Sequence, residues 1–395
     1  MDARVAEAAE LMTRFAERTG LTSDAPGRRY LWTDAFAVCN FLSLAHATRD
    51  GAYHELGLRL VDRVHDELGR HRADDRRRGW LSGLPDAEAR AHPTRGGLRI
   101  GKPLPERSEG ERLDPDLEWD RDGQYFHYLT KWMHALDQAA RWTGDVRLNV
   151  WACELAVTAH RAFVHGGAGR KRMVWKLSVD LSRPLVPSMG HHDPLDGFVT
   201  CKRLEATARA LGSAASPDLT SAIADFGGMI DEAALATDDP LGLGGLLLDA
   251  YRLSEVDAES ELIRHLLDAS VVGLHAYVSA STLRAPAYRR LGFRELGLAL
   301  GLAAASRIDG SVLVESLGAG VRDRVRELQR WAALGAAIAS YWLGRDPRRA
   351  PTWVEHQDIS DVMLATCLVP DGFLALGEPR GAGPADAPAA PPPAP

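Results

Sequence analysis

The chain has 395 residues, of which 45% are hydrophobic and 26% are charged, so it is long enough to bury a sizeable core. Its formal net charge of -7 excludes a dedicated nucleic-acid binder, because neutralising phosphates requires a basic surface.

Residues 1–20 form the first predicted element, an amphipathic helix in which acidic and basic side chains are interspersed. They lack the apolar core of a signal peptide. No run in the chain approaches 18 consecutive apolar residues, the length of a membrane span. We therefore expect a cytoplasmic protein with neither a membrane nor a nucleic acid among its partners. Its oligomeric state stays open.

Helical periodicity continues through the chain, whereas alternating strand patterns are scarce. Residues 54–68, for example, place Leu56, Leu60 and Val64 on one stripe and charged side chains elsewhere. The sequence therefore predicts an all-α fold.

Helical hairpins repeat along the sequence. The segments 33–68 and 122–163 each open on an acidic residue and an aromatic helix, break at a turn containing Gly and Asp, and end in a second helix. Asp50 aligns with Gly144 or Asp145. Weaker copies pair 193–212 with 218–235, 240–255 with 259–278, and 293–309 with 323–343. A last helix in 355–376 pairs either with a late segment or with the N-terminal helix.

The two helices of a hairpin differ in composition. First helices are rich in small residues and apolar on all sides, while second helices carry charges on one face. This contrast predicts an inner ring of buried helices within an outer ring of amphipathic ones. Residues 1–376 are expected to form this single domain. Residues 377–395 are rich in Pro and Ala and are expected to be a disordered tail.

Long connections interrupt the hairpins at 70–121, 164–195 and 280–292. Loops of this length in a compact domain are usually functional or disordered. The first two are rich in Trp, Arg, His and Gly, which favours a functional role.

The acid-and-aromatic openings YLWTDAF (30–36), WDRDGQYFHYLTKWMHAL (119–136) and HHDPLDGF (191–198) carry a resemblance to a known family. Together with the repeated hairpins, residues 28–376 resemble the six-hairpin glycosidase superfamily. The resemblance implies an (α/α)6 toroid that binds its ligand at one end of the inner ring. Members of this fold include glycoside hydrolases, polysaccharide lyases and sugar epimerases or isomerases.

The first candidate cluster spans residues 118–132. On a helix starting near Asp122, His127 and Lys131 lie four residues apart on one face, with Gln124 beside them. Asp120 and Asp122 lie at its start, where Asp122 also suits a helix cap. Three aromatic side chains offer faces for sugar rings: Trp119, Tyr125 and Trp132.

The second cluster combines Trp175 and Lys176 with the turn His191-His192-Asp193. Imidazole and carboxylate groups suit a divalent metal. Adjacent histidines often point to different sides, however, so we favour a sugar pocket over a metal site. We predict no metal and no cofactor.

The remaining helix openings repeat the theme. Trp32 is either a core residue or a sugar platform, Asp34 is the equivalent of Asp122 in the repeat, and His356 opens the last helix. If the ring closes, the opening carboxylates gather around one mouth: Asp34, Asp122, Asp196 and Asp358.

The first long loop contains Arg95, Arg99 and Lys102 around Gly96-Gly97. Such a loop is either solvated or binds the anionic group of a uronate or sugar phosphate. It is not a phosphate-binding P-loop, because Pro103 follows the lysine and no strand precedes it.

The preferred hypothesis is an enzyme that hydrolyses a glycosidic bond in a short oligosaccharide, anionic if the basic loop is functional. Hydrolysis requires two carboxyl groups, drawn here from Asp34, Asp120, Asp122, Asp193 and Asp196. The alternatives are an epimerase, isomerase or lyase with a histidine base, namely His127, His191 or His192, and a toroidal binding protein without chemistry.

Overall fold

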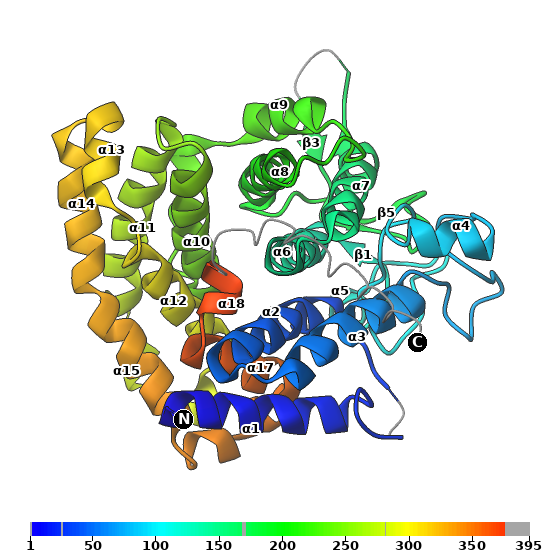
Figure 1. Cartoon of the computed structure of the whole chain (residues 1–395), viewed down its shortest axis with the longest axis horizontal. Helices are drawn as coiled ribbons and strands as arrows, with labels where there is room; N and C mark the ends of the chain where they lie inside the picture. The colour runs from blue at the N-terminus through cyan, green and yellow to red at the C-terminus, as the bar shows by residue number, and fades with distance from the viewer. Residues whose placement is uncertain (1, 25–26, 168–170, 281, 376–395) are drawn as a thin grey trace, which may run out of the picture.

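The computed structural model describes residues 2–24, 27–167, 171–280 and 282–375. The tail predicted for 377–395 lies outside them. The described chain is mostly helical (Figure 1), which confirms the all-α class.

A set of central helices comes from the predicted first helices of the hairpins. They are α2 (Leu31–Thr48), α6 (Phe126–Thr143), α8 (Asp193–Ala210), α10 (Pro240–Val256), α12 (Gly292–Ala305) and α17 (Gln357–Leu368). Each packs on the next in this order, and α17 packs on α2. The series of contacts therefore returns to the helix where it began.

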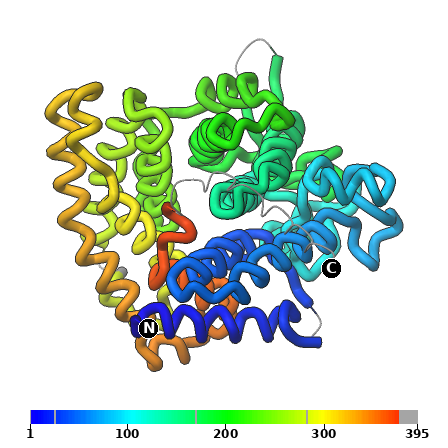
Figure 2. The backbone as a smooth tube through the Cα atoms, in the orientation of Figure 1, coloured from blue at the N-terminus to red at the C-terminus, as the bar shows by residue number. Residues whose placement is uncertain are grey.

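A flanking helix packs on each central helix, in the same order. These are α3 (Gly51–Leu68), α7 (Val146–Phe163), α9 (Thr220–Met229), α11 (Leu262–Ser279), α15 (Ala332–Leu343) and α1 (Ala3–Arg18). The N-terminal helix α1 thus pairs with α17, which settles the alternative left open for the last helix (Figure 2). Two further helices, α13 (Gly310–Leu317) and α14 (Ala319–Arg330), follow α12, and α14 packs on α11.

Burial separates the two sets of helices as expected. In α2 every residue from Leu31 to Ala45 is buried, whereas α3 buries one stripe that includes Leu60 and Val64. Glycines let α10 and α12 approach closely, because a Cβ on Gly244 would collide with the backbone of Gly297.

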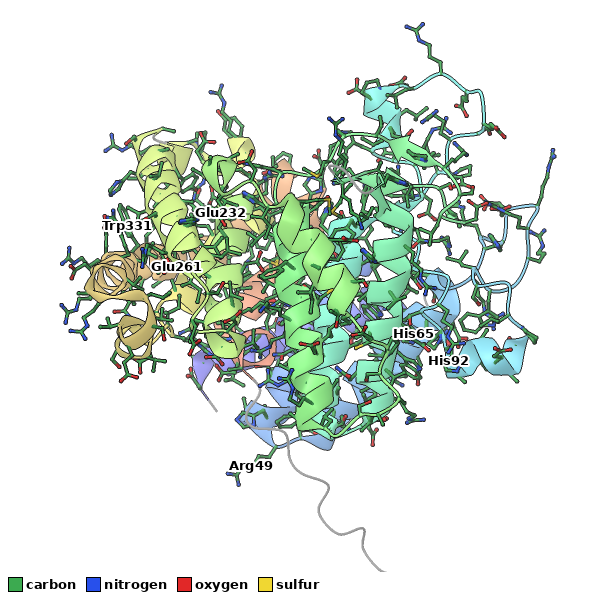
Figure 3. All side chains as sticks on the ribbon, turned by 90° about the horizontal axis from the view of Figure 1, so that it is seen from above. Arg49, His65, His92, Glu232, Glu261 and Trp331 are labelled. Atoms are coloured by element: carbon green, nitrogen blue, oxygen red, sulfur yellow. The ribbon has the colours of Figure 1, made fainter. Side chains whose placement is uncertain are left out.

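The first two hairpins share one turn geometry. In the first, Arg49 adopts the left-handed conformation (φ 59°) and its side chain extends away from the body in Figure 3, while the Asp50 carboxylate caps α3. In the second, Gly144 takes the left-handed position (φ 74°) and Asp145 caps α7. Asp50 therefore corresponds to Asp145 rather than to Gly144.

The loops between hairpins contain only short elements. The helical ones are α4 (Asp86–Ala91), α5 (Pro115–Glu118), α16 (Pro351–Val354) and α18 (Asp371–Leu374), with 3₁₀ turns at Glu232–Ala234, Thr282–Arg284, Ala287–Arg289 and Pro347–Arg349. The strands are β1 (Gln124–Tyr125), β2 (Val164–His165), β3 (Arg172–Met173), β4 (Lys176–Leu177) and β5 (Pro184–Val186). β4 pairs antiparallel with β1 and with β5, which holds the second long loop against the start of α6.

The helix α18 closes one end of the space among the central helices. The Phe373 ring stacks on Phe36 of α2 at 4.6 Å, and its carbonyl accepts hydrogen bonds from His134 and Gln138 of α6. The Tyr251 hydroxyl of α10 donates to the Leu374 carbonyl. Gln138 and Tyr251 lie in the C-terminal halves of α6 and α10, His134 lies in the middle of α6, and Phe36 lies in the N-terminal half of α2.

Among the described residues, no single helix has the length and apolar character needed to cross a membrane. The pair α12 and α13 meets that test only together, with a bend of 72° between them. All four cysteines are free and buried, as expected for small apolar side chains.

The contacts of α18 predict a stability effect. We expect Phe373→Ala to lower the free energy of unfolding by about 3–5 kcal/mol, because loss of the large ring leaves a cavity next to α2 and α6. Urea denaturation measures the change. The matched control is Val272→Ala, whose side chain is 59% exposed and should change stability by less than about 0.5 kcal/mol. Equal effects of both substitutions would contradict the role of α18.

Candidate functional site

Two adjoining cavities lie at the N-terminal ends of the central helices. The outer cavity, of about 890 Å³, lies between the starts of α2, α6 and α17 and the loop segments around Lys102 and Trp119. The inner cavity, of about 220 Å³, lies deeper among α6, α8, α10 and α12. Trp32, His127 and Leu241 line both, so the two form one continuous site.

The structure brings many of the predicted site residues together here. Those lining the outer cavity are Trp32, Asp34, Trp119, Asp120, His127, Trp175 and His356. Those lining the inner cavity are Trp32, His127, Lys131, His192 and Asp193. Of the four carboxylates expected at one mouth, Asp34 and Asp358 line the outer cavity and Asp196 the inner one.

The other predicted site residues line neither cavity: Arg95, Arg99, Asp122, Gln124, Tyr125, Trp132, Lys176 and His191. Most of them are held by partners in the long loops.

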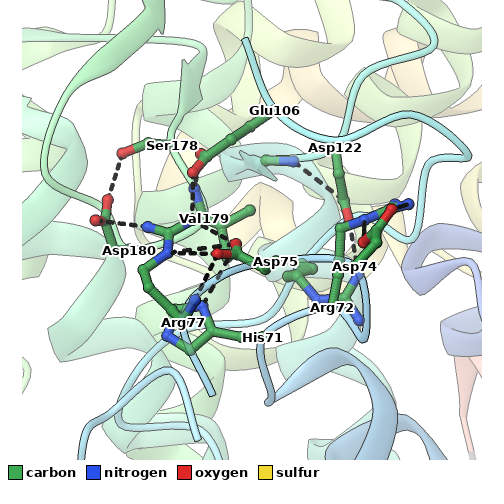
Figure 4. Close-up of polar contacts among 12 residues, drawn as sticks. His71, Arg72, Asp74, Asp75, Arg77, Glu106, Asp122, Ser178, Val179 and Asp180 are labelled. Atoms are coloured by element: carbon green, nitrogen blue, oxygen red, sulfur yellow. Dashed lines mark hydrogen bonds and ion pairs between the residues drawn. The ribbon is translucent and has the colours of Figure 1, made fainter. Parts of the chain in front are cut away.

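Asp122 is fully buried beneath the first long loop rather than at the mouth. Its carboxylate accepts from Arg99 Nη1 at 2.5 Å and from the Gly101 amide at 3.0 Å, with Arg72 at 3.6 Å (Figure 4). It does not cap α6, which begins at Phe126. The predicted position was wrong because the repeat aligns Asp122 with Asp34 but does not reveal that an arginine of the first long loop binds the Asp122 carboxylate.

Arg77 joins the two long loops to each other. Its guanidinium bonds Asp75 at 2.7 Å, Glu106 at 2.5 Å and Asp180 at 2.8 Å (Figure 4). Glu106 also accepts from the Val179 amide at 2.6 Å. Many charges of these loops therefore bind one another and support the wall of the outer cavity.

Gln124 also serves this loop contact. Its amide donates to the carbonyls of Gly96 and Val179, and its oxygen accepts from the Leu98 amide at 2.9 Å. A Cβ on Gly97 (φ 72°) would collide with this side chain. The space beside Gly96 and Gly97 is therefore occupied by the Gln124 side chain and not by an anionic ligand.

Further predicted groups are paired or packed away from the cavities. Lys176 Nζ bonds Glu118 at 2.8 Å, and Arg95 Nε bonds Glu154 at 2.9 Å. Trp132 is fully buried and donates to His65. Tyr125 is buried as well, and its ring stacks on that of Trp175.

His191 and His192 point to the same side, contrary to expectation. Their rings stack at 4.2 Å, and their Nε2 atoms meet the carbonyls of Ala234 and Leu235. Only His192 lines the inner cavity. Burial lowers its pKa to about 4. At neutral pH its Nε2 therefore carries the hydrogen donated to Leu235, and its Nδ1 is unprotonated.

His127 has the opposite arrangement. The Trp175 indole, which can only donate, bonds His127 Nδ1 at 3.2 Å. Burial lowers the pKa of His127 to about 4, so the ring is neutral and its hydrogen lies on Nε2. His127 is therefore a hydrogen-bond donor rather than a ready base.

Aromatic side chains form much of the outer wall. Trp119, 54% exposed, meets Trp175 edge to face at 5.2 Å. The hydroxyls of Tyr30 and Tyr128 share a hydrogen bond of 2.5 Å, and burial raises the pKa of both.

The inner cavity contains a group of carboxyls and cations. Asp196 accepts from Lys131 Nζ at 2.7 Å, and Arg252 lies 3.7 Å from its other oxygen. Burial opposes ionisation of Asp196, but Lys131 and Arg252 outweigh burial and hold its pKa below the usual value. Burial and the nearby Asp196 raise the pKa of Asp193 to about 7, and the same causes raise that of Asp249 to about 7.

Asp34 is a different kind of carboxyl. It accepts from the Tyr30 amide at 3.0 Å and lies 3.3 Å from Arg29. Burial raises its pKa to about 6 in spite of that arginine. These contacts hold the first turn of α2 in place. Asp34 therefore shapes the cavity wall, and its oxygens are already engaged rather than available to a ligand.

Asp249 and Arg252 were missed by sequence reasoning. A signal existed, because Asp249 interrupts an otherwise apolar run in the middle of α10. A charge that falls on a buried helix needs a partner.

Within residues 2–24, 27–167, 171–280 and 282–375, no group of three or more His, Cys, Asp or Glu side chains is arranged to hold a metal ion. A scan against family models finds no matching family, and searches of curated proteins and of solved structures find no match.

The Trp175 contact predicts a fixed tautomer for His127. In Trp175→Phe the donor to Nδ1 is lost, and we expect the ring to become a mixture of tautomers. Long-range ¹H–¹⁵N NMR of the imidazole nitrogens distinguishes the two forms. Trp119→Phe, which removes no bond to His127, should leave the ring unchanged. An unchanged tautomer in Trp175→Phe would contradict this assignment.

Asp193 predicts a pH-dependent stability. Its folded-state pKa of about 7 exceeds the ordinary value of 3.8, so between these pH values the folded protein keeps a proton that the unfolded chain releases. The free energy of unfolding should therefore fall as pH rises from about 4 to about 7. Urea denaturation across this range should show a shallower fall in Asp193→Asn. Asp323→Asn, 81% exposed, should keep the wild-type slope; equal slopes in all three proteins would refute the assignment.

Proposed function

We propose that this chain is an (α/α)6 toroid that hydrolyses a glycosidic bond in a short oligosaccharide. The contacts that return from α17 to α2, the helix α18 at one end and the cavities at the other support the toroid. The repeated acid-and-aromatic sequences at the helix starts also support the toroid.

One observation carries the reaction type. Asp193 and Asp196 both line the inner cavity, and their surroundings push their pKa values apart. A carboxyl that keeps its proton near neutral pH beside one that stays ionised is the pair that glycoside hydrolysis requires.

The roles follow from these states. Asp193 donates its proton to the glycosidic oxygen as the bond to the anomeric carbon breaks, and the leaving sugar departs as an alcohol. A water attacks the anomeric carbon, and Asp196, whose Oδ1 accepts no hydrogen bond from the described residues, accepts the water's proton. Exchange with solvent then removes the proton from Asp196 and returns one to Asp193. The products are two sugars from one glycoside and one water.

The surrounding groups bind the substrate. The faces of Trp32 and Trp175 pack against the apolar sides of sugar rings. His127 donates from Nε2 to a sugar hydroxyl. Lys131 holds Asp196 ionised and in place.

His192 favours a second candidate, proton abstraction by an epimerase or lyase. Its Nδ1 is unprotonated, and the ring lines the inner cavity. Incubation of free sugars in D₂O tests this alternative. Deuterium incorporation without cleavage, lost in His192→Gln, would replace hydrolysis by this reaction.

Asp193→Asn tests the hydrolase. On any short oligosaccharide that the wild type cleaves, we expect kcat to fall by about 10²–10⁴-fold, because the leaving group loses its acid. Mass spectrometry of the products measures the rate, and Asp323→Asn is the matched control.

Asp122→Asn provides a second comparison. It breaks the buried pair with Arg99 and should cost about 3–5 kcal/mol of stability, while each folded molecule keeps its turnover. Full activity of Asp193→Asn, or inactivity of folded Asp122→Asn, would overturn the assignment.

A further inference from the structure

Two cations at the rim of the outer cavity have no carboxylate partner among the described residues. Lys102 and Arg28 both line this cavity, and neither forms an ion pair with a described side chain. The nearest aromatic ring to the Lys102 ammonium is that of Tyr30, with the nitrogen 5.3 Å from the ring centre.

The other cations of the same cavity are engaged. Arg18 bonds Asp358 at 2.9 Å and also reaches Asp361, while Arg294 bonds Asp239 at 3.0 Å. Of the basic loop residues considered for an anion, Arg95 and Arg99 are bound to Glu154 and Asp122. Of the three basic loop residues Arg95, Arg99 and Lys102, Lys102 alone lines the outer cavity.

The environment of Lys102 makes its ammonium available to a ligand. It is half-buried, and burial lowers its pKa. The charges that act on it are those of Asp120, Arg28 and Asp122. Its backbone amide lies 3.4 Å from Asp122 Oδ1, which places the start of the side chain next to a carboxylate that Arg99 already neutralises.

The local charges do not cancel. Arg99 already neutralises Asp122 outside the cavity, which leaves two cations near Lys102, namely Lys102 itself and Arg28, and one carboxylate, Asp120. One positive charge is therefore left over at the wall that carries Tyr30. A ligand with a single negative charge would cancel it.

We propose that Lys102 and Arg28 form a subsite of the outer cavity for the carboxylate of an acidic sugar, so that the substrate is a uronate-containing oligosaccharide. The cleavage of such an oligosaccharide rests on the proposed function, whereas the binding of the carboxylate by Lys102 and Arg28 does not. A carboxylate matches the single excess charge, whereas a phosphate ester would bring close to two negative charges next to Asp120. The aromatic wall of Trp119 and Trp175 contacts the ring of the same sugar.

Binding of free monosaccharides tests the subsite without requiring catalysis. Trp32, Trp119 and Trp175 line the cavity, so intrinsic fluorescence reports occupancy. D-glucuronate should bind about tenfold more tightly than D-glucose at low ionic strength, and more tightly than glucose 6-phosphate. Added salt should weaken the binding of glucuronate and leave that of glucose unchanged.

Two substitutions locate the effect. In Arg28→Gln and in Lys102→Met we expect the preference for glucuronate over glucose to fall to about threefold or less. The matched control is Arg161→Gln, an exposed arginine of α7 outside both cavities, which should keep the full preference. Thermal unfolding of each variant confirms that it is folded.

The outcomes separate this inference from the proposed function. Equal binding of glucose and glucuronate, or a preference that persists in both variants, overturns the subsite even if oligosaccharides are cleaved. Tighter binding of glucose 6-phosphate overturns the assignment to a carboxylate. Glucuronate binding that depends on Lys102 and Arg28, without cleavage of any uronate oligosaccharide, supports the subsite and refutes the hydrolase.

Discussion

The ion pair between Lys131 and Asp196 joins α6 to α8 at 2.7 Å, and the chemistry of the inner cavity depends on it. A buried carboxylate without a cation would take up a proton. Because Lys131 and Arg252 keep Asp196 ionised, its negative charge raises the pKa of its neighbours Asp193 and Asp249. Lys131 on α6 and Arg252 on α10 thereby establish two protonation states in a single cavity, and replacement of Lys131 would alter the titration of the whole group.

The long loops show how charged residues can be numerous at a site and still be unavailable to a ligand. Arginines meet carboxylates within and between these loops, as Arg77 does with Glu106 and Asp180. Such pairs are strong where they are buried, and removing one partner leaves a costly unpaired charge. Fewer charged side chains are consequently available to a ligand than the composition of the loops suggests. Those that remain, such as Lys102, contribute more to the choice of ligand.

The helices were predictable because helical periodicity and turn residues are local properties of the sequence. Asp50 and Asp145 illustrate this, since each caps a helix within two residues of itself. The site was predictable only in part. His127, Asp193 and Trp32 were placed correctly at the cavities, because they stand at helix openings. Asp122 and Gln124 stand at similar places but are held by residues more than twenty positions away, which no local pattern reveals.

The pairing of α1 with α17 has a consequence for how the protein folds. The apolar stripe of α1, which includes Leu11 and Phe15, is synthesised long before α17 and meets this partner only after residue 368 has emerged. Contacts between such distant segments form late and slow the final folding step. Until α17 is made, that stripe lacks the helix that covers most of it in the folded protein. Exposure of this apolar stripe before α17 is made is therefore an aggregation hazard for the growing chain.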